Sequence, residues 1–350
     1  MKETGRRLHI DALRVLAMML VLYNHTGERG FTRYETVQGS AQGAYLALAV
    51  LDTIAVPLFF MISGALLLGR EEPLRACLKK RVLRYVLVLV GASTAIYVYI
   101  CRTDLSVMNP TDCLRGLYDG RITTSYWFLY AYLGYLLGLP LLRKLARAMT
   151  ERDFLYITAL MGVMNALSAL QWLCFEGDFV LNSNLLPFTA VRTVYYPLAG
   201  YFLEHRLADR VAQRRTLFAL FGAGALGVAL GCLVLKRAYA AYGYWPETAF
   251  GLFVFAPALA VFAGMKALSG HVRVPASAAR VLAEAGACTF GIYLFEKVFR
   301  DVSSRVYSAL VPVIGGFAAC WVWIACAFLL GMAVTAVLRR LPGLRKLLEP

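Results

Sequence analysis

Two ionisable side chains share one apolar stretch near the start of the chain, Leu13–His25. Arg14 and His25 have ten residues between them. Eleven helical steps of about 100° therefore place both on nearly the same face, roughly 16 Å apart along the axis. Ionisable groups inside a membrane helix are costly, usually face the protein interior and usually serve function. The spacing favours a functional pair, and snorkelling of each side chain to the nearest headgroups is the alternative.

His25 is the candidate for proton transfer. The other three histidines, His9, His205 and His271, lie in or beside basic segments, where a solvated position is expected. A neutral imidazole near pH 7 can accept a proton from a hydroxyl group. No serine or cysteine nucleophile is implied, so direct transfer is a simpler interpretation than a covalent intermediate.

Two polar residues could assist His25. Asp52 lies near the outer end of the next apolar run, at about the depth of His25. It either pairs with His25 and holds its tautomer, or caps a helix N-terminus. Asn24 lies about 100° round the helix from His25, so it either orients a substrate or caps a turn.

A basic pair marks the start of the third apolar run. Arg81 and Arg84 are three residues apart and share a helical face, where two guanidinium groups can hold phosphate oxygens. The spacing alone favours the plainer alternative, a basic cluster that anchors the helix. In the preceding run, Pro57 predicts a kink, and Ser63-Gly64 permits close approach of a backbone or a ligand.

Three further residues, Trp127, Arg192 and Glu296, are polar or aromatic and lie in or at the ends of predicted spans. Trp127 opens the fourth apolar run, where an interfacial aromatic belt is a more frequent role than a sugar-stacking platform. Arg192 lies within a predicted span and requires a partner or a water-filled cavity. Glu296 belongs to a charged cluster at the outer end of the ninth run, which either lines an acceptor site or forms a solvated loop.

The composition indicates a membrane protein. Of 350 residues, 60% are hydrophobic and 16% are charged, and the mean hydropathy is +0.62. Soluble domains are about half apolar and about 25% charged. The net charge of +15 comes from short basic clusters between apolar runs, which argues against a nucleic-acid partner. Eight cysteines show no ligand spacing, so no metal is expected, and one disulfide among Cys101, Cys113 and Cys174 stays open.

Runs of about 20 apolar residues predict an all-α, polytopic fold with about ten transmembrane helices in a single domain over residues 1–350. The expected spans are Ile10–His25, Ala44–Leu68, Val82–Cys101, Tyr126–Leu142, Phe154–Phe175, Leu186–Leu203, Leu217–Leu235, Thr248–Met265, Ala287–Phe299 and Val311–Leu338. The last is long enough to tilt or to include a bend at Gly315–Gly316. Alternate loops are rich in Lys and Arg, which predicts that both termini are cytoplasmic. Arg14 then lies towards the inner leaflet and His25 towards the outer one.

Five pieces together resemble the acyltransferase-3 family of integral membrane O-acyltransferases. In order they are Arg14 and His25 with ten residues between them, Phe59-Phe60-Met61-Ile62-Ser63-Gly64, Arg81 with Arg84, Trp127-Phe128, and Gly291-Ile292-Tyr293-Leu294. The resemblance covers the full length. One position departs from the family pattern, since Glu296 stands where relatives often carry histidine two residues after the tyrosine-leucine pair.

The resemblance implies ten helices and acyl-CoA, usually acetyl-CoA, as donor, with no metal. It implies that His25 is catalytic, and that Arg14, Arg81 and Arg84 hold the coenzyme, which raises the phosphate grip above the anchor. Asp52 is the second candidate catalytic residue. The candidate substrate contacts are Asn24, Ser63, Trp127 and Glu296.

The sequence therefore predicts a multi-pass O-acyltransferase of the cell membrane, and the expected location is a bacterial plasma membrane. The acyl group would pass from cytoplasmic acyl-CoA to a hydroxyl of a cell-surface carbohydrate or a lipid-linked saccharide. Two rivals remain: a transporter of a lipid-linked saccharide or small solute, and a membrane sensor or scaffold without turnover. A transporter would be expected to carry inverted repeats, which the sequence does not display.

Overall fold

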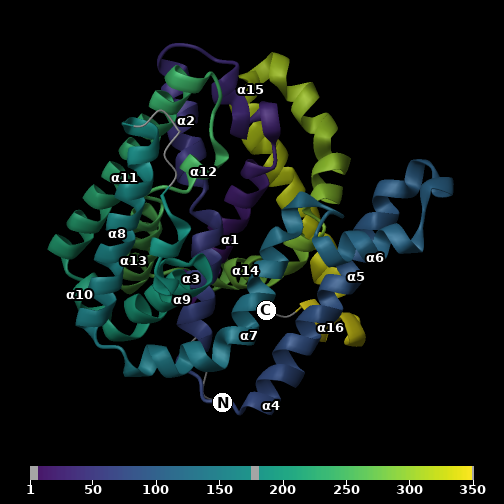
Figure 1. Ribbon diagram of the computed structural model, residues 1–350. Helices are drawn as coiled ribbons and strands as arrows, with labels where there is room; N and C mark the ends of the chain where they lie inside the picture. The colour runs from purple at the N-terminus through teal and green to yellow at the C-terminus, as the bar shows by residue number, and fades with distance from the viewer. Residues whose placement is uncertain (1–6, 175–180, 349–350) are drawn as a thin grey trace.

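A computed structural model describes residues 7–174 and 181–348 of the chain. Every regular element within these ranges is helical, as the sequence predicts (Figure 1). The α-helices are α1 (Leu8–Asn24), α2 (Ser40–Asp52), α3 (Ala55–Leu67), α4 (Leu74–Cys77), α5 (Leu83–Ile100), α6 (Pro110–Asp119), α7 (Trp127–Ala148), α8 (Glu151–Leu173), α9 (Arg192–Tyr201), α10 (Ala208–Val211), α11 (Arg214–Tyr242), α12 (Glu247–Phe250), α13 (Phe255–His271), α14 (Ala276–Leu294), α15 (Glu296–Leu338) and α16 (Pro342–Leu348). Two π-helical turns, Leu78–Val82 and Phe202–Arg206, extend α4 and α9.

Seven helical segments of the described chain are long and apolar enough to cross a membrane. They are Ser40–Leu67, Leu74–Thr103, Thr124–Ala148, Glu151–Leu173, Arg214–Tyr242, Glu247–His271 and Glu296–Leu338. The three other predicted spans correspond to the shorter helices α1, α9 and α14. The chain is thus an all-α membrane protein, while the count of ten spans and the cytoplasmic position of both termini stay predictions.

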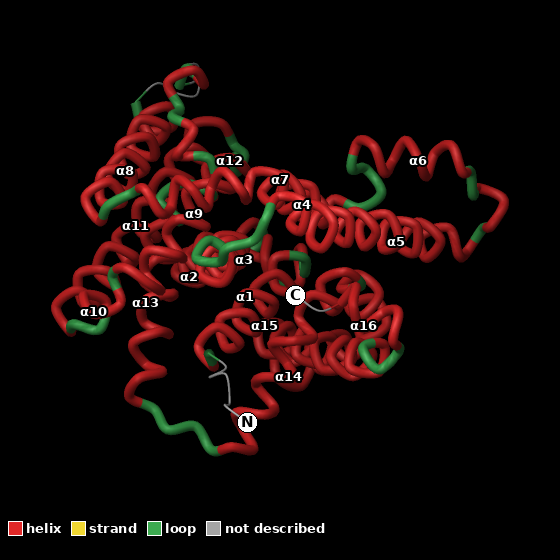
Figure 2. Tube along the Cα trace, turned by 90° about the horizontal axis from the view of Figure 1, so that it is seen from below, coloured by secondary structure: helices red, strands yellow, loops and turns green. Residues whose placement is uncertain are grey.

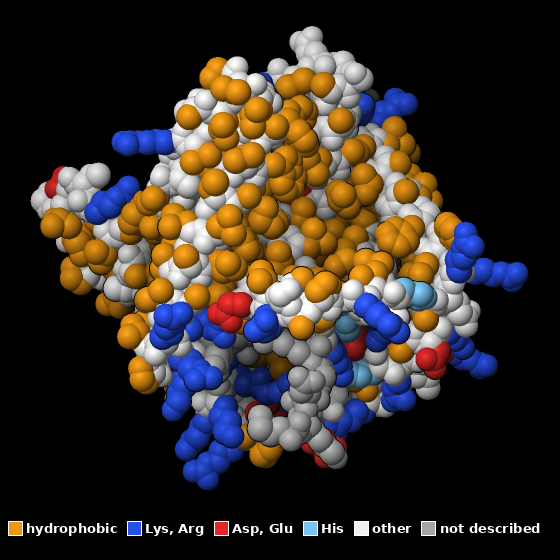
Figure 3. All heavy atoms as spheres, turned by 180° about the vertical axis from the view of Figure 1, so that it is seen from behind, with side chains coloured by type: hydrophobic (Ala, Val, Ile, Leu, Met, Phe, Trp, Pro, Cys, Tyr) orange, Lys and Arg blue, Asp and Glu red, His pale blue; other side chains and the backbone are white. Residues whose placement is uncertain are grey.

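Charge is distributed unevenly along the molecule. Seen from behind, hydrophobic side chains form a broad band, and Lys and Arg side chains gather below it (Figure 3). Helix α16, the last described element, lies in the lower half of Figure 1. A basic rim beside an apolar band is the arrangement expected of a membrane protein whose basic side faces anionic lipid.

Helix α1 lies at the centre and packs against α3, α13, α14 and α15. Its residues Leu13, Ala17 and Leu22 are completely buried, so the helix contacts protein on most of its surface. By contrast α6 stands beside α5, away from the helical body (Figure 2). Because α1 is central, its polar side chains face other helices, so they need polar partners or a cavity inside the protein.

The second predicted span is broken in two. Helix α2 ends at Asp52 and α3 begins at Ala55, so the interruption precedes the Pro57 that predicted a kink. Proline lacks an N–H group and clashes with the preceding turn, whereas in the first turn of a helix no N–H partner is needed. The break therefore puts Pro57 in the first turn of α3 and leaves Asp52 at a helix end inside the protein.

Helices α3 and α9 cross with their backbones in contact. A Cβ added at Gly64 would lie 1.9 Å from the carbonyl oxygen of Pro197, and one added at Gly200 would lie 1.9 Å from that of Met61. Only glycine fits both positions. The close approach predicted at Ser63-Gly64 is thus confirmed, and its partner is another helix.

The end of the chain departs from the prediction. The ninth span, expected at Ala287–Phe299, is wrong in its limits, because α14 ends at Leu294 and α15 starts at Glu296. Hydropathy misses the polar first half of α14, which begins at Ala276 directly after a proline. The expected bend is confirmed at Gly315, whose φ of 77° interrupts α15. The end of the fifth expected span, Phe175, lies outside the described residues.

Candidate active site

Several helices end at the level of His25, which follows the last residue of α1. Asp52 ends α2, Trp127 begins α7 and Arg192 begins α9. These residues line one small cavity of about 200 Å³. Helix ends leave backbone groups without helical partners, so polar groups are to be expected at this level of the protein.

A buried carboxylate lies behind His25, and it belongs to Glu296. Oε1 of Glu296 is 3.4 Å from Nδ1 of His25 and accepts a hydrogen bond of 3.0 Å from Oγ of Ser125. Oε2 accepts a bond of 2.6 Å from Nε of Arg300, whose Nη1 also donates to the His25 carbonyl oxygen at 2.5 Å. Glu296 is only 2% exposed, so the solvated-loop alternative is wrong.

Asp52 has a different partner from the one the sequence suggested. Its Oδ2 accepts a hydrogen bond of 2.9 Å from Nδ2 of Asn24, whereas Oδ1 is buried without a partner among the described residues. Asp52 ends α2 and has no bond to His25, so both pairing with His25 and N-terminal capping are wrong. Asn24 of α1 is thus bonded to the side chain of Asp52 from α2, and Asn24 and Asp52 both line the small cavity.

The geometry assigns distinct tasks to the two ring nitrogens of His25. Nδ1 of His25 is buried and has no hydrogen bond among the described residues, but the Glu296 carboxylate lies within ion-pair distance of it. A proton on Nδ1 would be stabilised there, because an ionised carboxylate can accept a hydrogen bond and cannot donate one. Nε2 is then unprotonated and carries the lone pair. Arg300 pairs with Glu296, so the negative charge of this buried carboxylate is compensated by a cation.

Trp127 and Arg192 form the opposite part of the wall. The guanidinium carbon of Arg192 lies 5.7 Å from the centre of a Trp127 ring, within cation–π distance. Arg192 thus has both an aromatic partner and a cavity, the two solutions expected for a cation within a predicted span. Trp127 lines this cavity and is 45% exposed, so it can also contact a ligand or lipid.

A second, larger cavity of about 930 Å³ contains the other candidate residues. Arginine dominates its charged lining: Arg7, Arg14, Arg70, Arg81 and Arg84. The sequence singled out three of these five. The other two, Arg7 and Arg70, lie directly before α1 and three residues after the end of α3, and their positions in the sequence give no sign that they meet.

Four of these arginines also contact protein groups of the described chain, and Nη1 of Arg7 is 3.0 Å from Oε1 of Glu204. Nη1 of Arg14 is 3.4 Å from Oδ1 of Asp11, and Nη1 of Arg84 donates to the carbonyl oxygen of Lys346 at 3.3 Å. Nε of Arg81 donates to Oε2 of Glu72 at 2.7 Å. Arg81 therefore helps to fix its own helix, and both Arg81 and Arg84 line the cavity.

Glu72 holds the lower edge of this cavity in place. Its Oε2 accepts hydrogen bonds from both Arg81 and Arg143, the second at 3.0 Å. Burial alone would raise the pKa of Glu72, but these two hydrogen bonds outweigh it and lower the pKa below its usual value. The carboxylate consequently stays charged near neutral pH and keeps both arginines in position.

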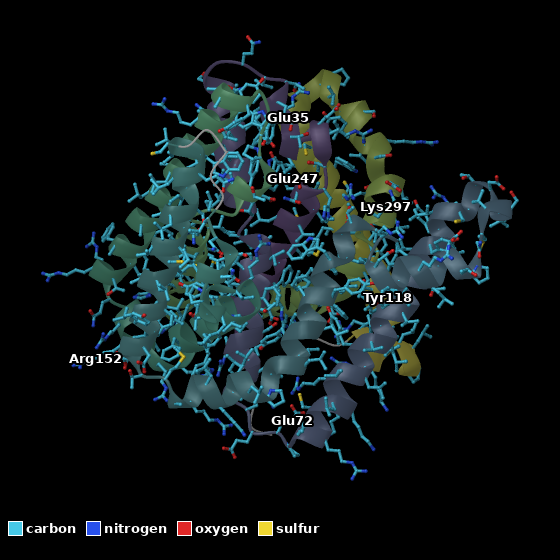
Figure 4. All side chains as sticks on the ribbon, viewed as in Figure 1. Glu35, Glu72, Tyr118, Arg152, Glu247 and Lys297 are labelled. Atoms are coloured by element: carbon cyan, nitrogen blue, oxygen red, sulfur yellow. The ribbon has the colours of Figure 1, made fainter. Side chains whose placement is uncertain are left out.

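The two cavities follow one another along the molecule. Glu72, beside the large cavity, lies at the lower end, whereas Glu247, in the wall of the small one, lies in the upper half (Figure 4). Ser63 lines the large cavity and donates a hydrogen bond of 3.1 Å to the hydroxyl of Tyr132. The described linings of the two cavities have only Phe128 and Tyr293 in common.

Neither a disulfide nor a cluster of metal-ligating side chains is found among the described residues. All eight cysteines are free, including Cys101, Cys113 and Cys174, among which a disulfide was left open. No group of three or more His, Cys, Asp or Glu side chains in the described ranges is arranged to hold a metal ion.

Comparison with known proteins agrees with this arrangement. The family model described as an acyltransferase domain, Acyl_transf_3, matches residues 7–340, nearly the whole chain. The chain belongs to the acyltransferase-3 family. The candidate membrane-spanning helices and all residues that line the two cavities except Leu347 fall within the matched range, so this is a membrane acyltransferase. No curated protein and no solved structure matches the chain.

Proposed function

We propose that this acyltransferase moves an acetyl group from cytoplasmic acetyl-CoA to a hydroxyl group, with His25 as general base. The acceptor would be a cell-surface carbohydrate or a lipid-linked saccharide at a cell membrane, in keeping with a bacterial plasma membrane. The observation that carries the proposal is a single juxtaposition. An imidazole backed by Glu296 at 3.4 Å lines a small cavity, which meets a large cavity lined by five arginines.

The donor would occupy the large cavity. Its phosphates would bind Arg81 and Arg84, because guanidinium groups bind phosphate oxygens in a bidentate manner. Arg14 stands further along α1, three turns before His25, so the pantetheine arm would pass it on the way to the small cavity. The described lining of this cavity contains five arginines and one acidic residue, Asp11. Its electrostatic potential is therefore positive and suits a polyanion.

The acceptor would enter the small cavity. Trp127 offers an aromatic surface, and the Asn24–Asp52 pair offers hydrogen-bonding groups close to His25. Oδ1 of Asp52 lacks a partner among the described residues, and a hydroxyl group of a saccharide would satisfy it. Ser63 lies in the large cavity instead, so a contact from Ser63 would be to the donor.

The reaction needs one proton acceptor and no covalent enzyme intermediate. The acceptor oxygen bonds to the thioester carbonyl carbon while its proton passes to Nε2 of His25. Glu296, on the other side of the ring, stabilises the imidazolium that forms. The carbon–sulfur bond then breaks, and CoA leaves as the thiol with the proton returned from Nε2.

The test is release of CoA from acetyl-CoA by the purified protein, followed with a thiol reagent in membrane vesicles that contain the acceptor. Wild-type protein should release CoA, and His25→Ala should retain acetyl-CoA binding but lose at least about a hundredfold in rate. A transporter or a scaffold would release none. Full activity in His25→Ala would remove the assigned base, and absence of CoA release from wild-type protein would remove the proposed function.

A further inference from the structure

Two aromatic side chains stand where the cavities meet. Phe128, near the start of α7, and Tyr293, near the end of α14, each line both the large and the small cavity. Their ring centres are 5.6 Å apart and the rings lie edge to face at 80°. Among the described residues this pair alone lines both cavities, so a group that travels from the arginines to His25 would pass it.

Packing holds the Phe128 ring in place. It contacts the rings of Phe59, Phe60, Tyr132 and Trp127, at centre distances between 5.4 and 6.4 Å. The residue is only 8% exposed. A ring enclosed by this many neighbours cannot turn aside without displacing them, because protein interiors are close-packed.

Hydrogen bonds hold the other half of the constriction. The Tyr293 hydroxyl donates to the carbonyl oxygen of Ser125, and the Tyr126 hydroxyl donates to that of Leu294. These two reciprocal bonds tie the end of α14 to the start of α7. The hydroxyl of the same Ser125 donates to Glu296, so the constriction and the carboxylate behind His25 share one rigid support.

Chemistry fixes which part of the donor passes first. In an acyl thioester the acyl group lies beyond the sulfur, so it leads the coenzyme through the constriction into the small cavity. There it must share about 200 Å³ with the acceptor, against about 930 Å³ on the donor side. Each added methylene has to pass between two fixed rings and then takes space from the acceptor.

We propose that Phe128 and Tyr293 form the acyl-length selector of this enzyme, which admits acetyl and rejects longer acyl groups. The inference rests on the proposed function, since it concerns the same donor and the same base. It adds a specificity role for two residues that touch both cavities. Phe202 provides a matched comparison, because it is a fully buried ring that stacks on Phe154, outside the cluster around Phe128, and lines neither cavity.

The experiment measures CoA release from acetyl-, butyryl- and octanoyl-CoA by the full-length protein in membrane vesicles. For wild-type protein, kcat/KM should fall at least about tenfold from acetyl to butyryl, the discrimination that small hydrophobic pockets achieve. Phe128→Leu should raise the butyryl-to-acetyl ratio about tenfold. Phe202→Leu, the same change at a buried ring outside this cluster, should leave the ratio at the wild-type value.

Distinct results would overturn the inference and the function. Equal rates for all three donors in wild-type protein, or an unchanged ratio in active Phe128→Leu, would overturn the selector while leaving acyl transfer intact. No CoA release from any donor would overturn the function and the selector together. If Phe128→Leu does not fold, Phe128→Met and Tyr293→Leu test the same pair, with the thermal unfolding midpoint in detergent as the check on folding.

Discussion

Replacing Glu296 by glutamine removes the charge behind His25 and keeps the shape of the side chain. Oε1 lies 3.4 Å from Nδ1 of His25, and at an effective dielectric constant of about 20 two unit charges at this separation attract by about 5 kcal/mol. The cation of Arg300, bonded to the same carboxylate, offsets part of this. We therefore expect Glu296→Gln to lower kcat about 10²- to 10³-fold, with a smaller change in KM for acetyl-CoA, because the imidazolium forms only in the transition state.

The assay is again CoA release, with acetyl-CoA binding measured separately. Glu284→Gln is the matched control, since Glu284 also pairs with an arginine, Arg339 at 2.7 Å, but is exposed and lines neither cavity. This control should retain wild-type kcat. A folded Glu296→Gln protein whose kcat stays within about threefold of wild type would refute the role of Glu296 in holding and charging His25.

Three further changes probe the donor site, the ion pairs around Glu204 and the crossing of α3 with α9. Arg84→Gln should raise KM for acetyl-CoA about tenfold with little change in kcat, because it removes a charged contact to phosphate. Burial raises the pKa of Glu204, but hydrogen bonds, that of His9 foremost, lower it to about 2 from 4.5. Glu204→Gln should then cost about 3 kcal/mol of unfolding free energy at pH 7, and wild-type protein should lose the same stabilisation as the pH falls from about 4.5 towards 2, seen as a falling thermal midpoint. Gly64→Ala should prevent correct packing, measured as loss of monodisperse protein, because its Cβ would lie 1.9 Å from the Pro197 carbonyl oxygen.

Features that depend on neighbouring residues could be predicted from the sequence. The all-helical class follows from apolar runs of membrane length, and the interruption near Pro57 follows from the missing N–H of proline. The bend at Gly315 and the close approach at Gly64 follow from the absence of a side chain. Each of these depends on local geometry, which the order of residues carries directly.

The partner of His25 could not be predicted in this way. Asp52 and Glu296 were both placed near the depth of His25, and the choice between them depends on how α2, α14 and α15 pack around α1. The break at Phe295 turns Glu296 inward, and hydropathy gives no sign of that break. Likewise nothing local reveals that Phe128 and Tyr293 meet between two cavities, because the residues come from helices far apart in the chain.

The most direct test of the central claim is a structure of the protein with a non-hydrolysable acetyl-CoA analogue bound. The account predicts the phosphates at Arg81 and Arg84, the pantetheine arm beside Arg14, and the acetyl carbonyl beyond the Phe128–Tyr293 pair, within hydrogen-bonding reach of an acceptor held by His25. A coenzyme bound outside the large cavity, or one whose acetyl group points away from His25, would contradict it.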